Sequence, residues 1–143
     1  MKQKKNLQNA LNHRASIEVP SHPMYLSMIR IFLEKLLKLI DIQTLIIEDI
    51  KSAVDEACSN VIKYAYKYSY DKTIKVYFSY SPKEIVVIIE DYGEKPQDLS
   101  FQGRDLLDLK PGGLGMHFIK KAFDEIVFKS SKKTNKLKMV RYL

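Results

Sequence analysis

Apolar residues recur at helical spacing in two long segments of the chain. Over 21–39 this pattern predicts an amphipathic helix, and its apolar positions are Leu26, Ile29, Ile31, Phe32, Leu33, Leu36 and Leu37. Ser21 is the expected N-cap of this helix, and Pro23 suits its first turn. The same spacing predicts a second helix over about 42–68, which ends at the polar sequence SYD at 69–71.

Strand patterns lie on both sides of these helices. Residues 15–19 predict a short edge strand that Pro20 ends, and TIKVYFS at 73–79 alternates between apolar and polar residues, as a half-buried strand does. IVVIIE at 85–90 is apolar on both faces, which indicates a central strand. A polar connection of little periodicity then occupies 91–109, and connections of that length in a compact domain are usually functional or disordered.

The end of the chain predicts one more helix and a hairpin. The helix spans 116–124, and EIVFKS and LKMVRYL pair across a lysine-rich turn. The order of elements indicates an α+β fold: a two-layer sandwich in which about three helices cover one face of a mixed, mostly antiparallel sheet. We expect a flexible N-terminus at 1–14 and a single domain at 15–143.

Composition narrows the class of protein. The chain has 143 residues, 45% of them apolar and 29% charged, as is ordinary for a globular domain. The longest apolar run falls far short of the roughly 20 residues that a membrane helix needs, so we expect no membrane association. The single cysteine, Cys58, cannot form an internal disulfide, which favours a reducing cytoplasm and a core position.

The formal net charge of +7 raises the question of nucleic-acid binding. The lysines are scattered apart from clusters at 2–5 and 132–138, and no zinc-ligand spacing or helix-turn-helix signature accompanies them. A solvated basic surface is the simplest interpretation, and an acidic partner or a polyphosphate ligand is the alternative. We expect no direct contact with nucleic acid.

Two polar residues interrupt the apolar stripe of the second helix. Glu56 and Asn60 are separated by about one helical turn, so their side chains project from the same side. A carboxylate can accept a proton from a hydroxyl, and a carboxamide oxygen suits magnesium. The alternative is a solvated helix face, because such pairs also arise by chance.

Two further sequences suit a ligand. Asp91 and Gly93 follow the central strand, where an aspartate can accept a hydrogen bond from an exocyclic amino group and a glycine allows close approach; a simple turn is the alternative. In KPGGLGMHF, glycines precede a helix, so free backbone N–H groups face a possible phosphate; a flexible hinge is the alternative. Together with Glu56 and Asn60 these features describe a site for one nucleotide.

In order and spacing, EACSN, DYG and GGLGMHFIKKAFDEI resemble the N, G1 and G2 boxes of the GHKL (Bergerat-fold) ATPases. They are most similar to the bacterial anti-sigma factor and serine-protein kinase branch of that superfamily. The likeness spans nearly the whole chain, since VPSHPMYLSMIRIFLEKL also resembles the opening strand and helix of that branch. The resemblance implies a histidine-kinase-like ATPase fold, with ATP and Mg²⁺ as ligands.

The resemblance also implies a role for each matching residue. Glu56 would be the general base, Asn60 would coordinate Mg²⁺, and Asp91 would bind the adenine amino group beside Gly93. The backbone N–H groups that would bind the phosphates belong to Gly113, Leu114, Gly115 and Met116. A lid at about 94–111 would cover the nucleotide.

The activity that the resemblance implies is phosphorylation of a serine on an anti-anti-sigma protein of the STAS type. Release from that antagonist would let the kinase sequester a sigma factor, and members of the branch commonly form homodimers. A non-catalytic ATP-binding module that sequesters a protein partner is the alternative.

The sequence departs from the family pattern at two positions. Lys95 replaces the second glycine of D-x-G-x-G, which could alter lid closure or phosphate contact, and Tyr64 stands where relatives often have histidine. Arg104 is a candidate charge-stabilising residue in the lid, and His117 is expected at the surface beside it.

Overall fold

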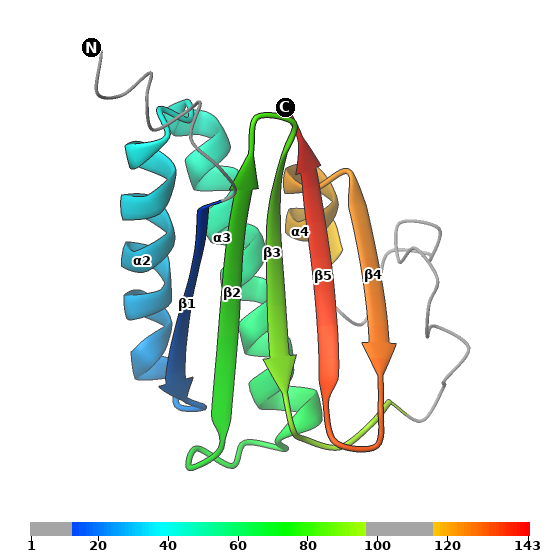
Figure 1. Ribbon diagram of the computed structural model, residues 1–143. Coiled ribbons are helices and arrows are strands. Elements are labelled where there is room, and N and C mark those ends of the chain that lie inside the picture. Colours follow the sequence, from blue (N-terminus) through cyan, green and yellow to red (C-terminus); the bar gives the residue numbers. More distant parts are fainter. Residues whose placement is uncertain (1–12, 97–115) are drawn as a thin grey trace.

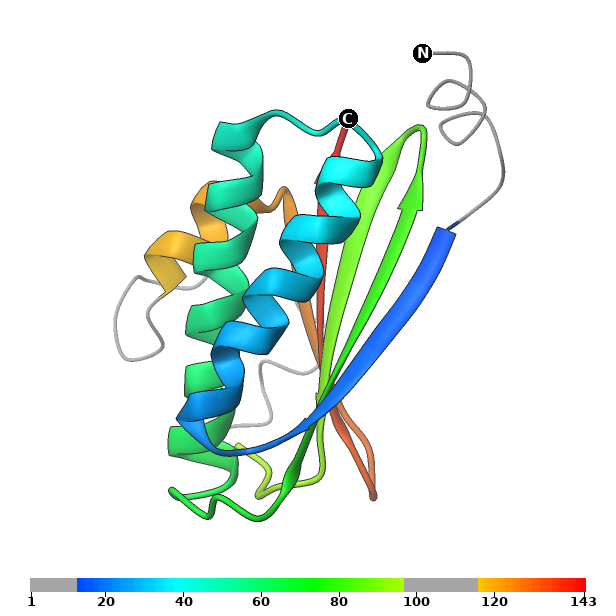
Figure 2. The same cartoon turned by 90° about the vertical axis from the view of Figure 1, so that its left-hand side faces the viewer.

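The computed structural model describes residues 13–96 and 116–143, which form a two-layer α+β sandwich (Figure 1). The helices are α2 (Leu26–Leu39), α3 (Thr44–Asn60) and α4 (Met116–Ala122), and the strands are β1 (His13–Pro20), β2 (Thr73–Ser81), β3 (Glu84–Asp91), β4 (Glu125–Ser130) and β5 (Asn135–Tyr142). The helices lie together on one face of the sheet (Figure 2). The predicted fold class is therefore confirmed.

The sheet has the order β1-β2-β3-β5-β4, and its described pairings are all antiparallel. The expected mixed component of the sheet is thus not found in the described part of the chain. β3 is the central strand and buries residues on both faces, as its uninterrupted apolar sequence predicts. The predicted edge strand is β1, which begins at His13, so His13 and Arg14 belong to the sheet rather than to the expected N-terminal tail.

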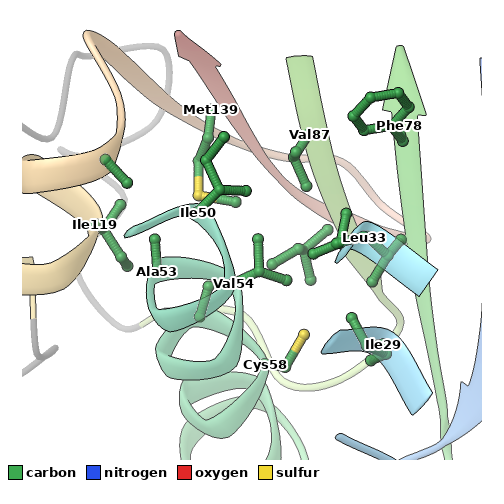
Figure 3. Close-up of a cluster of buried hydrophobic side chains, with 14 of the residues drawn as sticks. Ile29, Leu33, Ile50, Ala53, Val54, Cys58, Phe78, Val87, Ile119 and Met139 are labelled. Atoms are coloured by element: carbon green, nitrogen blue, oxygen red, sulfur yellow. The ribbon is translucent and has the colours of Figure 1, made fainter. Parts of the chain in front are cut away.

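The core fills the space between the helices and the sheet (Figure 3). It is built from side chains of every layer: Ile29, Leu33, Ile50, Ala53, Val54, Cys58, Phe78, Val87, Ile119 and Met139. Burial of one Leu or Ile side chain contributes about 1.5–3 kcal/mol, so these positions hold α2, α3 and α4 on the sheet. Cys58 is fully buried, as predicted, and burial raises the pKa of its thiol.

The first helical segment begins differently from the prediction. His22, not Ser21, caps the short 3₁₀ turn η1 (Pro23–Tyr25) that leads into α2: its ring Nδ1 accepts a hydrogen bond from Met24 N at 3.1 Å. Ser21 is buried and its hydroxyl bonds distant backbone instead, donating to Ser69 O at 2.6 Å and accepting from Lys72 N at 3.0 Å. The expected N-cap was wrong because these long-range partners take the hydroxyl.

The second predicted helix changes its geometry before it ends. α3 is followed by the π-helical segment η2 (Val61–Ala65), in which Tyr66 N donates to Val61 O at 3.0 Å. Lys67 and Tyr68 then have φ values of 49° and 64°, a left-handed conformation that turns the chain toward β2. π-helical turns often occur next to functional sites.

No helix in the described ranges is both long and apolar enough to cross a membrane.

Candidate functional site

The C-terminal end of the α3–η2 helix lies against the loop that follows β3 (Figure 1). Glu94 N donates to Ala65 O at 2.8 Å, and Tyr92 N donates to Tyr66 Oη at 2.9 Å. The Tyr66 hydroxyl in turn donates to Thr73 O, at the start of β2. These bonds bring the helix that carries Glu56 and Asn60 to the strand end that carries Asp91.

Gly93 packs tightly on the backbone of Ala65, at the joint between η2 and the loop after β3. A Cβ atom at Gly93 would lie 2.4 Å from Ala65 O and 2.6 Å from Ala65 C, both backbone atoms. Only glycine fits there without a shift of the main chain. The structure thus gives the predicted Gly93 a definite packing role, whereas room for a purine ring stays a prediction.

Glu56 and Asn60 occupy the last turns of α3, and both are half-buried. Within the described ranges the Glu56 carboxylate makes no hydrogen bond or ion pair. Other acidic groups of the same helix are paired: Asp55 with Arg30, and Glu48 with Lys51 at 3.1 Å. Among the described residues, Glu56 thus differs from these neighbouring acidic groups in having no hydrogen-bond or ion-pair partner.

Asp91 is buried, with 5% of its surface exposed, and its Oδ1 atom accepts two hydrogen bonds. Gly93 N donates at 2.9 Å, and Asn135 Nδ2 donates at 2.8 Å. Burial raises the pKa of the Asp91 carboxyl, while these two donors and the charge of Lys95 oppose the rise. Both bonds use Oδ1, and neither uses the second carboxylate oxygen, Oδ2.

Asn135, Ser130 and Lys95 complete this cluster, and sequence reasoning missed the first two. Asn135 opens β5 directly opposite Asp91 in the register, and Ser130 Oγ donates to Asn135 Oδ1 at 2.8 Å. Lys95 Nζ donates to Ser130 Oγ at 3.0 Å and also to Ser131 O. Lys95 thus binds the β4–β5 turn in the structure. The sequence pattern suggests an effect on lid closure or phosphate contact and does not indicate this contact with the turn.

Part of the predicted site falls on residues outside the described ranges: Gly113, Leu114, Gly115, Arg104 and the lid, of which only 94–96 are described. Met116 is the first residue of α4 and is buried. α4 packs beside α3, and Lys121 pairs with Asp49 at 3.4 Å. His117 is exposed, as predicted, and its ring meets that of Phe118 edge-on.

The described residues of the candidate site offer separate polar groups and not a cluster of metal ligands. They contain no cluster of three or more His, Cys, Asp or Glu side chains that could hold a metal. An ionised Asp91 offers an acceptor to an amino group, and the Asn60 amide oxygen is a hard ligand of the kind that Mg²⁺ prefers. An open hollow of about 670 Å³ adjoins the joint at Ala65 and Gly93, but Glu56, Asn60 and Asp91 do not line it.

Comparison with known proteins identifies the family of the chain. Residues 19–141 match the family model of the histidine kinase-like ATPase domain. The chain is 31% identical over 118 residues to the serine-protein kinase RsbW of Bacillus subtilis (strain 168), an alignment that covers 77% of this chain and 74% of that relative. It is also 31% identical over 137 residues to the serine-protein kinase RsbW of Staphylococcus aureus (strain MSSA476), covering 89% and 85% of the two chains.

A solved structure shows the same fold. The crystal structure of the RsbU and RsbW domains of a Mycobacterium tuberculosis protein aligns with a TM-score of 0.65 and 14% identity. The alignment covers 91% of this chain and 32% of that longer chain. The resemblance found in the sequence motifs is confirmed, and the chain belongs to the histidine kinase-like ATPase domain family.

Proposed function

We propose that the protein is an ATP-dependent protein serine/threonine kinase. The observation that carries the proposal is the half-buried Glu56 carboxylate, which has no partner in the described ranges and lies one turn before Asn60. Binding of a nucleotide alone does not need such a base. The names of the relatives, serine-protein kinases, support the same activity.

The proposed reaction transfers the γ-phosphoryl group of ATP to a serine hydroxyl. The serine oxygen forms a bond to the γ-phosphorus, the bond from that phosphorus to the β–γ bridging oxygen breaks, and ADP leaves. Glu56 accepts the proton of the hydroxyl as its oxygen attacks. A positioned general base typically contributes about 10²–10⁴-fold to the rate.

The other residues of the site bind and orient the nucleotide. Asp91 would accept a hydrogen bond from the adenine amino group, and Asn60 would supply an amide oxygen to Mg²⁺, whose charge would stabilise that of the phosphates. We assign the phosphate contacts to the backbone N–H groups of Gly113, Leu114, Gly115 and Met116, on the strength of the family resemblance.

The proposed partners follow from the same resemblance. The substrate is a STAS-type anti-anti-sigma protein, whose phosphorylation frees the kinase to sequester a sigma factor. The proposed assembly is a homodimer that acts in the cytoplasm. Sedimentation velocity of the purified chain tests the assembly, since a monomer at all concentrations would contradict it.

Phosphotransfer to a protein substrate tests the central proposal. The purified chain is incubated with radiolabelled ATP, Mg²⁺ and each STAS-type protein that the source genome encodes, and phosphoserine is measured by mass spectrometry. We expect transfer by the wild type and a loss of about 10²-fold or more in Glu56→Gln. The matched control is Glu48→Gln, since Glu48 lies on the same helix and is exposed; it should retain the wild-type rate.

Two outcomes would contradict the kinase. One is an unmodified substrate, and the other is a Glu56→Gln rate equal to that of the wild type. A tight complex with an unmodified partner would instead support the alternative, a non-catalytic ATP-binding module that sequesters a protein.

A further inference from the structure

A continuous chain of hydrogen bonds connects Lys95 to Asp91 through the β4–β5 hairpin. Lys95 Nζ lies 3.0 Å from Ser130 Oγ, Ser130 Oγ lies 2.8 Å from Asn135 Oδ1, and Asn135 Nδ2 lies 2.8 Å from Asp91 Oδ1. Asn135 and Ser130 are 2% and 8% exposed, so solvent contributes little to the inner links. We call these four residues the Lys95–Asp91 relay.

Lys95 fixes which atom donates and which accepts in every hydrogen bond of the relay. A lysine ammonium group can only donate, so Ser130 Oγ accepts from Lys95 and its own proton goes to Asn135 Oδ1. The amide of Asn135 must then present its nitrogen to Asp91. That nitrogen also lies 3.4 Å from Gly93 O and 3.3 Å from Glu94 O, so a reversed amide would place its oxygen against three acceptors.

The relay therefore decides what Asp91 can offer to a ligand. Its Oδ1 atom accepts from both Asn135 Nδ2 and Gly93 N, and two such donors favour the ionised carboxylate. The positive charge of Lys95 acts in the same direction. With the carboxylate ionised, the Oδ2 atom, which neither bond uses, is an acceptor and cannot donate.

We propose that Lys95, Ser130 and Asn135 are positioning residues that hold Asp91 as an acceptor for the exocyclic amino group of adenine, and so set a preference for ATP over purine nucleotides without that group. The inference rests on the proposed ATP-binding function and adds the origin of its base specificity. Lys95 replaces the second glycine of the D-x-G-x-G pattern, and the relay gives that replacement a role. A site built around a hydrogen bond rejects ligands that cannot make it.

The test compares dissociation constants for ATP and for purine riboside triphosphate, which has hydrogen in place of the amino group. Isothermal titration calorimetry with Mg²⁺ gives both constants, and their ratio measures base selectivity. The wild type should prefer ATP by about tenfold or more, as expected for a hydrogen bond to a charged group. Lys95→Met and Ser130→Ala should each reduce the ratio by about threefold or more, because the Asn135 amide and Asp91 lose their fixed orientation.

Two matched variants separate the relay from general charge effects. Lys132→Met removes the same charge from an exposed position in the β4–β5 turn, so it can weaken both nucleotides but should keep the ratio. Lys95→Arg keeps a charged donor and should retain most of the selectivity. Since Lys95 is exposed, Lys95→Met tests the relay even if Ser130→Ala does not fold.

The outcomes distinguish this inference from the proposed function. A wild type that prefers ATP, with the same ratio in Lys95→Met and Ser130→Ala, would overturn the relay and leave the kinase standing. A wild type that binds neither nucleotide would overturn both. A reduced ratio in both variants together with an unchanged ratio in Lys132→Met would support the relay.

Discussion

Two opposing effects act on the pKa of the Asp91 carboxyl group. Burial disfavours its charge and raises its pKa, whereas the N–H donors of Asn135 and Gly93 and the charge of Lys95 favour the ionised form. Burial dominates, so the folded protein binds the Asp91 proton more tightly than the unfolded chain does. The ionised form of buried Asp91 is therefore held at some expense of stability.

The Asp91→Asn variant should show this loss of stability as a pH-dependent difference in the free energy of unfolding from the wild type. Because the folded pKa of Asp91 is raised, its favourable contribution is complete below the unfolded pKa and is lost as pH rises through the folded pKa. The stability of Asp91→Asn relative to the wild type should therefore increase from acidic to neutral pH. Urea unfolding of the nucleotide-free proteins at several pH values measures this difference, and a difference that falls toward neutral pH would contradict the assignment.

Single residues also mark the limit of prediction from the sequence. Asp91 could be singled out because it follows a recognisable buried strand and precedes Gly93. Asn135 could not, because its role depends on the register that places it opposite Asp91. Ser21 has the sequence context of an N-cap, but its partners Ser69 and Lys72 are distant in the chain, so local patterns do not contain them.

At the scale of elements, the site depends on the joint between η2 and the loop after β3. Ala65 O, freed by the end of the helix, accepts from Glu94 N, and Gly93 packs on the same carbonyl. This joint fixes the distance between the helix of Glu56 and Asn60 and the strand of Asp91. Its geometry should therefore affect stability and nucleotide binding together.

Gly93→Ala tests the joint. The added methyl group would lie 2.4 Å from Ala65 O, so the loop has to move away from η2. Overpacking of this kind costs about 1–3 kcal/mol of unfolding free energy, and we expect a weaker affinity for ATP as well. Denaturant unfolding and calorimetry measure the two effects.

Ala65→Gly provides the control for that variant. It removes the Ala65 Cβ atom, which would lie 2.8 Å from the new methyl group, but leaves the closer backbone atoms in place. The double variant should therefore not recover the stability lost in Gly93→Ala. Full recovery, or a Gly93→Ala protein as stable as the wild type, would show that the backbone contact is not limiting.

The elements themselves were largely predictable because their apolar periods are regular. α2, β2, β3 and the β4–β5 hairpin lie where the spacing of apolar residues indicated. The π-helical turn of η2 was not predictable, since its residues continue a helical pattern and only the closing bond of Tyr66 N to Val61 O distinguishes it. The spacing of apolar residues does not distinguish this five-residue hydrogen bond from the four-residue bond of an α-helix.

At the scale of the whole molecule, the topology brings the ends of α3 and β3 together although they are distant in the sequence. α3, which ends at Asn60, and β3, which ends at Asp91, finish at the same edge of the sandwich (Figure 1). The family resemblance predicts that the motifs on these elements form one site, whereas the apolar periodicity predicts only the separate elements. The hydrogen-bonded surroundings of Asp91 needed the tertiary structure, because they join β3, β4 and β5.

The most direct test of the account is the thermal stabilisation of the chain by Mg²⁺-ATP, measured for the wild type and for Asp91→Asn. At 100 times the dissociation constant, bound ATP should stabilise the wild type by about 2.7 kcal/mol and raise its melting temperature. Asparagine keeps an oxygen for Asn135 and Gly93 but presents an N–H group to the adenine amino group, so most of this shift should disappear in the variant. An equal shift in both proteins, or no shift in the wild type, would contradict an adenine site at Asp91.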